Sequence, residues 1–406
     1  MGRIVHTGDT HIGYLQYHLH SRREDFLYAF RKVVEDAIEE KVDAIVHSGD
    51  LFHKANPDLI DIAGTIEILQ LAKNDDIPIL AIAGNHEMQR GLQWIDVFER
   101  LGLVTHLGKN PHTIENEEGG IAIYGMDYVH PDKREGLDYQ FEESSSKYKI
   151  LVSHGQFTPL VLVPGRNTWD IELVLKSSNV EFDVVLLGDE HIQKQKKIGN
   201  AWVTYCGSTE RASISERERR SYNIIDLEGG VKIGTKNIRT RKFVYVEEEI
   251  PEGENIEYLY ERIKEKEHEF SDAIVVVSVG GGGVKIPIAE IEEYCKSKGA
   301  IHAIIKPSKG EIEELGVREW VYFEDPAEVV ENEMGSLGLS EAARCIDMLV
   351  RDRNIVDSNL KMHVKESIEK IIGESEKFEK VPVQEGERES PGNDGENSEY
   401  TLGDFS

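Results

Sequence analysis

The N-terminal half of the chain alternates short apolar runs with helical patterns. Apolar runs at 3–7, 44–48, 77–83, 149–153 and 183–187 have the length of buried strands. Between the first three runs, segments 23–39 and 57–73 carry apolar residues at helical spacing, and Pro57 suits the first turn of the second helix. Strands that alternate with helices predict a layered α/β fold.

Each of the five apolar runs leads into polar side chains that can bind metal ions. These are Asp9, His11, Asp50, Asn85, His154, Asp189 and His191. In layered α/β folds, ligands bind outside the carboxyl ends of strands, which is where this set falls. Each carboxylate alone is equally compatible with a helix cap, and each histidine with a core position. His6, inside the first run, is expected to be a hydrogen-bonded core residue.

The number and type of these side chains predict the kind of metal site. Seven ligands exceed one tetrahedral zinc and suit two cations that share a carboxylate. Imidazole, carboxylate and amide donors without thiolate favour manganese, iron or similar ions. The three cysteines, Cys206, Cys295 and Cys345, lie far apart, so neither a disulfide framework nor a thiolate zinc site is expected.

The pattern changes after about Arg241. Strands are expected near 243–246, 273–279 and 303–305, with a helix at 256–266, which together predict a small second α/β domain. Four glycines at 280–283 lack the Lys-Ser/Thr of a phosphate-binding loop and are expected to form a turn.

The C-terminal part has two helical patterns and a polar tail. Segments 340–350 and 360–372 carry apolar stripes that need a partner, or that pack back on this chain. Residues 374–406 hold ten acidic and three basic side chains and are expected to be disordered. The expected divisions are 1–238, 239–325, a linker at 326–337, a helical segment at 338–373 and the tail at 374–406.

Composition narrows the class of protein. The 406 residues, 39% of them hydrophobic, suffice for two to three domains. No run approaches the roughly 18 apolar residues of a membrane span, and the N-terminus leads directly into a strand, so a cytoplasmic location is expected and no membrane partner.

The net charge of −29 argues against a uniformly basic surface for nucleic acid. Any DNA contact is therefore expected from residues near the metal site. Most of the charged residues are equally compatible with an ordinary solvated surface. The candidates are Tyr17, His18, Arg22, Arg23, Lys194 and Arg211.

The ordered motifs resemble those of calcineurin-like metallophosphoesterases. They are Asp9-x-His11, Gly49-Asp50, Gly84-Asn85-His86-Glu87, His154 and Gly188-x-x-His191. Within that superfamily, Gly13-Tyr14-x-Gln16, Leu51-Phe52-His53 and the run from Tyr205 to Arg211 most resemble the meiotic-recombination-eleven (SbcD) family of DNA repair nucleases. The resemblance covers about residues 1–235. It implies a two-sheet α/β sandwich flanked by helices, a small α/β capping domain and C-terminal helices.

The resemblance also implies two Mn²⁺ ions per subunit and a role for each ligand. Asp9, His11, Asp50 and His191 would hold one ion, and Asp50, Asn85, His154 and Asp189 the other, with Asp50 bridging. The family usually has Gly-His-x-His where this chain has Gly188-Asp189-Glu190-His191. Glu190 is therefore an alternative to Asp189 as a ligand.

By the same resemblance, His86 would act as general acid or stabilise the transition state, with Glu87 supporting it. His53 would steer the DNA phosphate, the alternative being an exposed loop histidine. The implied protein is a 3′ to 5′ exonuclease and single-strand endonuclease of double-strand break repair. It would work as a homodimer with a Rad-fifty-type ATPase bound through 338–373.

Two alternative functions remain compatible with the sequence. A phosphoesterase for small phosphate esters would share the metal site but would have no use for the capping domain. A scaffold with a weakened site, suggested by Asp189, would bind DNA and partner without cleavage.

Overall fold

The computed structural model describes residues 2–88, 91–116, 119–134, 136–161, 168–281 and 283–307. They all fall in one compact unit, Met1–Glu313. The linker, the two C-terminal helices and the acidic tail expected from the sequence lie outside the described residues, as does Cys345.

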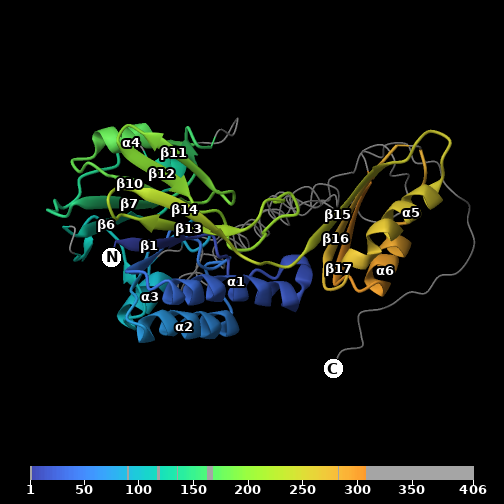
Figure 1. The fold of residues 1–406 in the computed structure, drawn as a ribbon, viewed down its shortest axis with the longest axis horizontal. Helices are drawn as coiled ribbons and strands as arrows, with labels where there is room; N and C mark the ends of the chain where they lie inside the picture. The colour runs from blue at the N-terminus through green and yellow to red at the C-terminus, as the bar shows by residue number, and fades with distance from the viewer. Residues whose placement is uncertain are drawn as a thin grey trace, which may run out of the picture. The chain divides into compact units, whose positions relative to one another are not determined.

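Two six-stranded sheets stack on each other in the larger part of the structure (Figure 1). The first has the order β14 (Lys232–Asn237), β13 (Ser221–Asp226), β1 (Arg3–Thr7), β2 (Ala44–His47), β3 (Ile79–Ala81) and β4 (Thr105–His106). The second has the order β11 (Lys194–Ile198), β12 (Ala201–Tyr205), β10 (Val184–Gly188), β7 (Tyr148–His154), β6 (Ile121–Met126) and β5 (His112–Ile114).

Parallel pairing gathers the strand ends that carry the candidate ligands. β1 pairs with β2 and β2 with β3 in parallel, and β7 pairs with β10 in parallel. The carboxyl ends of each set therefore share one edge of their sheet.

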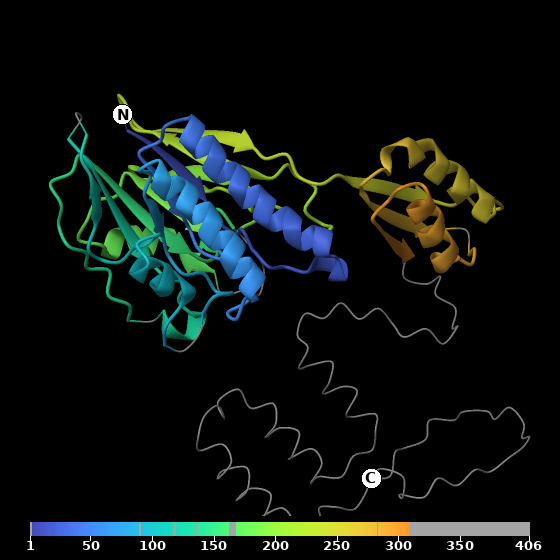
Figure 2. The same cartoon turned by 90° about the horizontal axis from the view of Figure 1, so that it is seen from below.

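Helices cover the outer faces of the two sheets. α1 (His20–Glu39) and α2 (Leu59–Asn74) lie side by side on the first sheet with α3 (Trp94–Arg100), and α4 (Ile171–Ser177) covers the second (Figures 1 and 2). Short elements complete this part: η1 (Gln16–His18), η2 (Pro131–Lys133) and a two-stranded sheet of β8 (Phe157–Thr158) and β9 (Trp169–Asp170).

Alternation along the strands builds separate cores on the two faces of the first sheet. Val5 and Ile45 pack with Phe30 of α1, whereas Ile4 and Val46 pack between the sheets with residues such as Val152. Successive strand residues point to opposite faces, so a strand covered on both sides is apolar throughout. His6 is buried within this run, and its Nε2 lies 3.1 Å from Ser48 Oγ, as expected for a core histidine.

Residues 243–281 and 283–307 form a second, smaller α/β module. β15 (Phe243–Glu249), β16 (Ile274–Gly280) and β17 (His302–Pro307) pair in parallel, and α5 (Ile256–Lys266), η3 (Glu267–Glu269) and α6 (Ile288–Ser297) connect them. Val275 and Val277 pack in the core of this module. On the other face of the sheet, Ile274 packs with Ile214 from the 206–220 loop. Among the described residues, no helix is long and apolar enough to cross a membrane.

Candidate metal centre

The loops that follow β1 and β2 are joined by backbone hydrogen bonds. The amide of Asp9 donates to the carbonyl of Gly49 at 3.0 Å, and that of His11 to the carbonyl of Asp50 at 3.0 Å. The two loops therefore continue the pairing of their strands beyond the sheet, which fixes three candidate ligands relative to one another.

Four of the candidate ligands have a left-handed backbone conformation. The φ angles are 48° at Asp9, 44° at His11, 56° at Asp50 and 91° at Asp189. Residues other than glycine rarely adopt positive φ, and such strain gathers at functional sites. The surrounding hydrogen bonds hold these side chains towards one point at the cost of local strain.

One cluster of donor atoms is formed by Asp9, His11 and His191, whose ligand atoms lie within 4.8 Å of one another. His11 Nε2 and His191 Nε2 are 3.1 Å apart. His191 Nδ1 donates to Glu216 Oε1 at 2.7 Å, so its Nε2 presents a lone pair when the ring is neutral.

A second cluster is formed by Asp9, Asp50 and His154 within the same limit of 4.8 Å. His154 Nδ1 donates to the carbonyl of Ser48 at 2.8 Å, which leaves Nε2 facing Asn85 Oδ1 at 2.8 Å. Asp189 Oδ1 lies 3.9 Å from the same Nε2. Asn85 and Asp189 thus border this cluster through His154.

Asp50 lies between the two clusters. Its Oδ2 is 3.9 Å from His11 Nε2 and 3.5 Å from His154 Nε2. The structure therefore brings together all seven side chains expected from the sequence. Asp9 also reaches both clusters, which the sequence did not indicate.

The electrostatics of the site favour bound cations. Burial raises the pKa of Asp9 to about 7, and burial lowers the pKa of His11 well below its usual value. Burial also lowers the pKa of His154, but Asp50, Asp9 and Asp189 more than offset it, giving a value of about 10. The raised pKa of His154 reflects carboxylates that stabilise positive charge in the site. Once that proton is displaced, the imidazole, carboxylate and amide donors fit a pair of divalent ions.

Comparison with known proteins places this site in a family. Residues 2–193 match the model of the calcineurin-like phosphoesterases. A DNA double-strand break repair protein Mre11 from Haloferax volcanii is 42% identical over 375 residues, which is 92% of this chain and 83% of that protein. The Mre11 of Halobacterium salinarum is 42% identical over 92% of this chain and 95% of that protein.

The chain belongs to the Mre11 family. Its core is a calcineurin-like phosphoesterase domain with two stacked sheets, as the resemblance of the motifs implied. A solved dimetal phosphatase from Danio rerio is 10% identical, covers 58% of this chain and 96% of its own, and has a TM-score of 0.39.

Asp189 and Glu190 lie where this chain departs from the family motif, and the structure gives their carboxylates different partners. The amide of Asp189 donates to both carboxylate oxygens of Asp9, which draws Asp189 into the site. Glu190 instead accepts from Lys194 Nζ at 2.8 Å and from the amide of Ile192. Glu190 is therefore directed to Lys194, and Asp189 is the residue that faces His154.

Two further histidines border the site. His11, His53 and His86 form a third cluster of ligand atoms within 4.8 Å. His86 Nδ1 donates to the carbonyl of His53 at 2.8 Å, and its Nε2 lies 4.0 Å from Asp50 Oδ2. The His53 ring stacks on Tyr14 with 3.9 Å between centroids. His53 is therefore held at the site, not exposed in a loop.

The expected support of His86 by Glu87 is wrong. Glu87 is buried and accepts from the amides of Phe52 and Gly84, at 3.0 and 3.1 Å. Its carboxylate closes the loop after β3 onto the loop after β2. The Nδ1 of His86 is held by the His53 carbonyl instead.

Several basic residues expected to contact DNA have partners within the fold. Arg22 is buried, and its guanidinium binds Gln16, Asp25, Glu210 and the carbonyl of Arg211, so the expected DNA contact is wrong. Arg23 binds Asp61 and Asp58, and Arg211 binds Thr240 and nearby carbonyls. Tyr17 stacks on His302 of the second α/β module, and His18 is exposed.

Two residues near the site were missed by the sequence reasoning. Tyr14 lies in a motif that supported the family resemblance, so its contact with His53 had a signal in the sequence. Glu216, the partner of His191, lies in a loop of alternating charge that resembles a solvated surface. Only the fold shows that its carboxylate points inward.

Proposed function

We propose that this chain is a metal-dependent DNA nuclease of double-strand break repair. The observation that carries the proposal is the convergence of two donor clusters on Asp50 in a phosphoesterase fold. The names of its Mre11 relatives support DNA as the substrate. The proposed activities are 3′ to 5′ exonuclease on duplex DNA and endonuclease on single strands.

Two Mn²⁺ ions per subunit are the proposed cofactors. Asp9, His11, Asp50 and His191 would hold one ion, and Asp50, Asn85, His154 and Asp189 the other. When bound, such a pair supplies an activated water and neutralises the charge of the phosphate. The absence of thiolate among the donors supports manganese or a similar ion over zinc.

The histidines beside the metals are proposed to act on the DNA. The side chain of His86 is 36% exposed, and the hydrogen bond of its Nδ1 to the His53 carbonyl leaves Nε2 directed towards the site. In its doubly protonated form, the ring can donate the Nε2 proton to the leaving oxygen and keep the Nδ1 proton on the His53 carbonyl. His53, whose ring stacks on Tyr14, is proposed to orient a phosphate by hydrogen bonding.

One experiment tests the reaction. The purified full chain is incubated with linear duplex DNA and Mn²⁺, beside a small chromogenic phosphate ester and an Asp50→Ala control. We expect metal-dependent DNA cleavage that Asp50→Ala abolishes. Cleavage of the ester alone would instead establish a small-substrate phosphoesterase, and binding of DNA without cleavage would establish a scaffold.

Asp189 is proposed as a ligand in place of the family histidine. Asp189→Ala is expected to weaken Mn²⁺ binding by about 10-fold or more, the usual effect of losing a metal-site residue. Glu190→Ala, its neighbour directed to Lys194, is the matched control and should bind Mn²⁺ as the wild type does. Equal affinities for all three proteins, measured by calorimetry, would remove Asp189 from the ligand set.

The remaining proposals concern partners. Residues 239–325 would form a domain that caps the nuclease, and residues 338–373 would bind the coiled coil of a Rad-fifty-type ATPase. Deletion of residues 338–406 is expected to abolish co-purification with that ATPase and to leave Mn²⁺-dependent cleavage intact. Unchanged co-purification would refute the assignment.

A further inference from the structure

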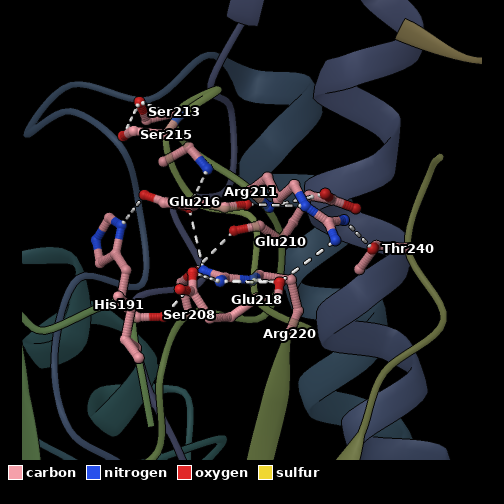
Figure 3. A network of polar contacts seen from close by, with 12 residues as sticks. His191, Ser208, Glu210, Arg211, Ser213, Ser215, Glu216, Glu218, Arg220 and Thr240 are labelled. Atoms are coloured by element: carbon pink, nitrogen blue, oxygen red, sulfur yellow. Dashed lines mark hydrogen bonds and ion pairs between the residues drawn. The ribbon is translucent and has the colours of Figure 1, made fainter. Parts of the chain in front are cut away.

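The loop between β12 and β13, residues 206–220, passes beside the candidate ligand His191 (Figure 3). At its start, the amide of Ser208 donates to the carbonyl of His191 at 3.2 Å. Gly207 has a φ of +79°, and a Cβ there would lie 3.1 Å from that carbonyl. The loop thus approaches the backbone of His191 as closely as a glycine permits.

The side chain of Glu216 links this loop to the imidazole of His191. Glu216 Oε1 accepts from His191 Nδ1 at 2.7 Å. Its Oε2 accepts from the amide of Ala212 at 3.0 Å and from Arg220 Nη1 at 3.1 Å. Three hydrogen bonds from three different groups therefore hold the carboxylate in position.

Arg220 holds the backbone of His191 and its side-chain partner together. The guanidinium is buried, and its Nη1 donates to the His191 carbonyl at 2.9 Å as well as to Glu216. It also donates to Ser208 Oγ at 3.0 Å and to the carbonyl of Glu218. A buried arginine whose three nitrogens all donate hydrogen bonds fixes the geometry of the groups around it.

The two metal-facing histidines with partners on Nδ1 are fixed in different ways. His154 donates from Nδ1 to the backbone carbonyl of Ser48, a contact that no side-chain substitution removes. His191 donates to a side chain. In both rings the contact keeps the proton on Nδ1 and directs the Nε2 lone pair into the site.

We infer that Glu216, held by Arg220, is a positioning residue that sets the tautomer and orientation of His191 for metal binding. The inference rests on the proposed two-metal site and adds a residue that no sequence motif indicates. Loss of a partner that orients a metal-bound histidine typically weakens metal affinity by about 10- to 100-fold. The effect should fall on the ion held by Asp9, His11, Asp50 and His191.

The test measures Mn²⁺ binding to the full chain by titration calorimetry and by the electron paramagnetic resonance signal of free Mn²⁺. Wild type is expected to bind two ions per subunit. In Glu216→Ala, the dissociation constant of one ion should rise about 10- to 100-fold while the other stays unchanged. DNA cleavage lost at low Mn²⁺ should return at high Mn²⁺, which a general loss of structure would not allow.

The matched control is Glu218→Ala in the same loop. Its carboxylate is 52% exposed and lies 3.8 Å from Arg220, so both Mn²⁺ affinities should stay within about twofold of wild type, as for a surface ion pair. Circular dichroism and thermal unfolding of the metal-free proteins report folding. Should Glu216→Ala fail to fold, Glu216→Gln carries the test, because it keeps the shape and one acceptor but cannot accept from both His191 and Arg220.

Wild-type affinity at both sites in the folded Glu216 variant would overturn the inference. Loss of cleavage with unchanged Mn²⁺ binding would overturn it too. Failure of the proposed two-metal site would give a different result, because the wild type itself would then not bind two Mn²⁺ ions.

Discussion

Single residues at the strand ends decide how closely neighbouring loops can pack. The clearest case is Gly84, which precedes Asn85. A Cβ at this position would overlap both the backbone nitrogen and the Oδ1 of Asp50. The loop after β3 can therefore approach the loop after β2 only because residue 84 has no side chain.

Gly84→Ala is expected to lower the free energy of unfolding by about 2 kcal/mol, as overpacking does, and to weaken Mn²⁺ binding. Gly108→Ala is the matched control, since a Cβ there would meet nothing within 4 Å and the φ angle is not positive. Urea denaturation and Mn²⁺ titration check both variants. Equal stability of the two would contradict the packing argument.

His106 is a residue whose charge contributes to stability outside the metal site. Its ring lies between Asp127, at 2.9 Å from Nε2, and Asp96, at 2.9 Å from Nδ1. The hydrogen bond to Asp127 is the main cause that raises the pKa of His106 to about 9, against partial burial. Asp127 also accepts from the amide of Ala83, next to Gly84.

The pKa of His106 is higher in the folded protein than its value near 6.5 in the unfolded chain. The charge of His106 therefore contributes fully to stability below about pH 6.5. It is lost as the pH rises towards about 9. We expect the wild type to lose about 1 to 3 kcal/mol more stability over this range than His106→Gln does. Urea denaturation at intervals from pH 6 to pH 9.5 measures the difference, and parallel curves for the two proteins would exclude a role for the charge.

At the scale of elements, Arg23 of α1 binds acidic residues at the start of α2 and so joins the two helices. The side chain of Arg23 is 16% exposed and donates through Nε and Nη2 to both carboxylate oxygens of Asp61. Nη2 also donates to Asp58, the residue before α2. This planar fork matches a carboxylate in a way that lysine cannot.

Arg23→Lys is therefore expected to lower the free energy of unfolding by about 1 to 2 kcal/mol while leaving DNA affinity unchanged. Arg31→Lys serves as the control, because Arg31 contacts Glu67 of α2 at 3.4 Å in an exposed pair and should change stability by less than about 0.5 kcal/mol. Thermal and urea unfolding give the stabilities, and fluorescence anisotropy gives the DNA affinity. Weaker DNA binding with unchanged stability would restore Arg23 as a DNA contact.

At the scale of the whole molecule, we propose the homodimer that the family resemblance implies. The most exposed apolar side chains among the described residues provide a test. Leu59 and Ile60, at the start of α2, are 83% and 70% exposed. Adjacent exposed side chains of this size are typical of a protein interface. Leu59→Asp combined with Ile60→Asp is expected to convert a dimer to a monomer, because burial of two carboxylates would be unfavourable.

Light scattering after size-exclusion chromatography measures the mass of each variant. Leu173→Asp, on α4 and 54% exposed, is the matched control and should stay dimeric. A dimeric double variant would exclude the start of α2 as the interface. A monomeric wild type would refute the homodimer.

Local patterns predicted the elements well, and the seven side chains that they singled out lie close together in the fold. The helix at 256–266 has the bounds expected from its stripe, and α1 begins only three residues earlier than expected. The expectation for Arg22 is wrong for a reason that lies in the tertiary structure. Arg22 was assigned from its charge and its place near the site motifs, but Glu210, 188 residues away, pairs with it in the interior.

The sequence by itself determined which residues form strands, which polar side chains follow them, and the family to which the chain belongs. Hydrophobic periodicity and strand ends depend on residues close in sequence, so the sequence alone can predict them. The tertiary structure alone decided that Glu87 closes a loop, that Glu190 turns to Lys194, and that Glu216 holds His191. These choices depend on which loops meet in space, because a carboxylate binds the donor that the fold places nearest to it.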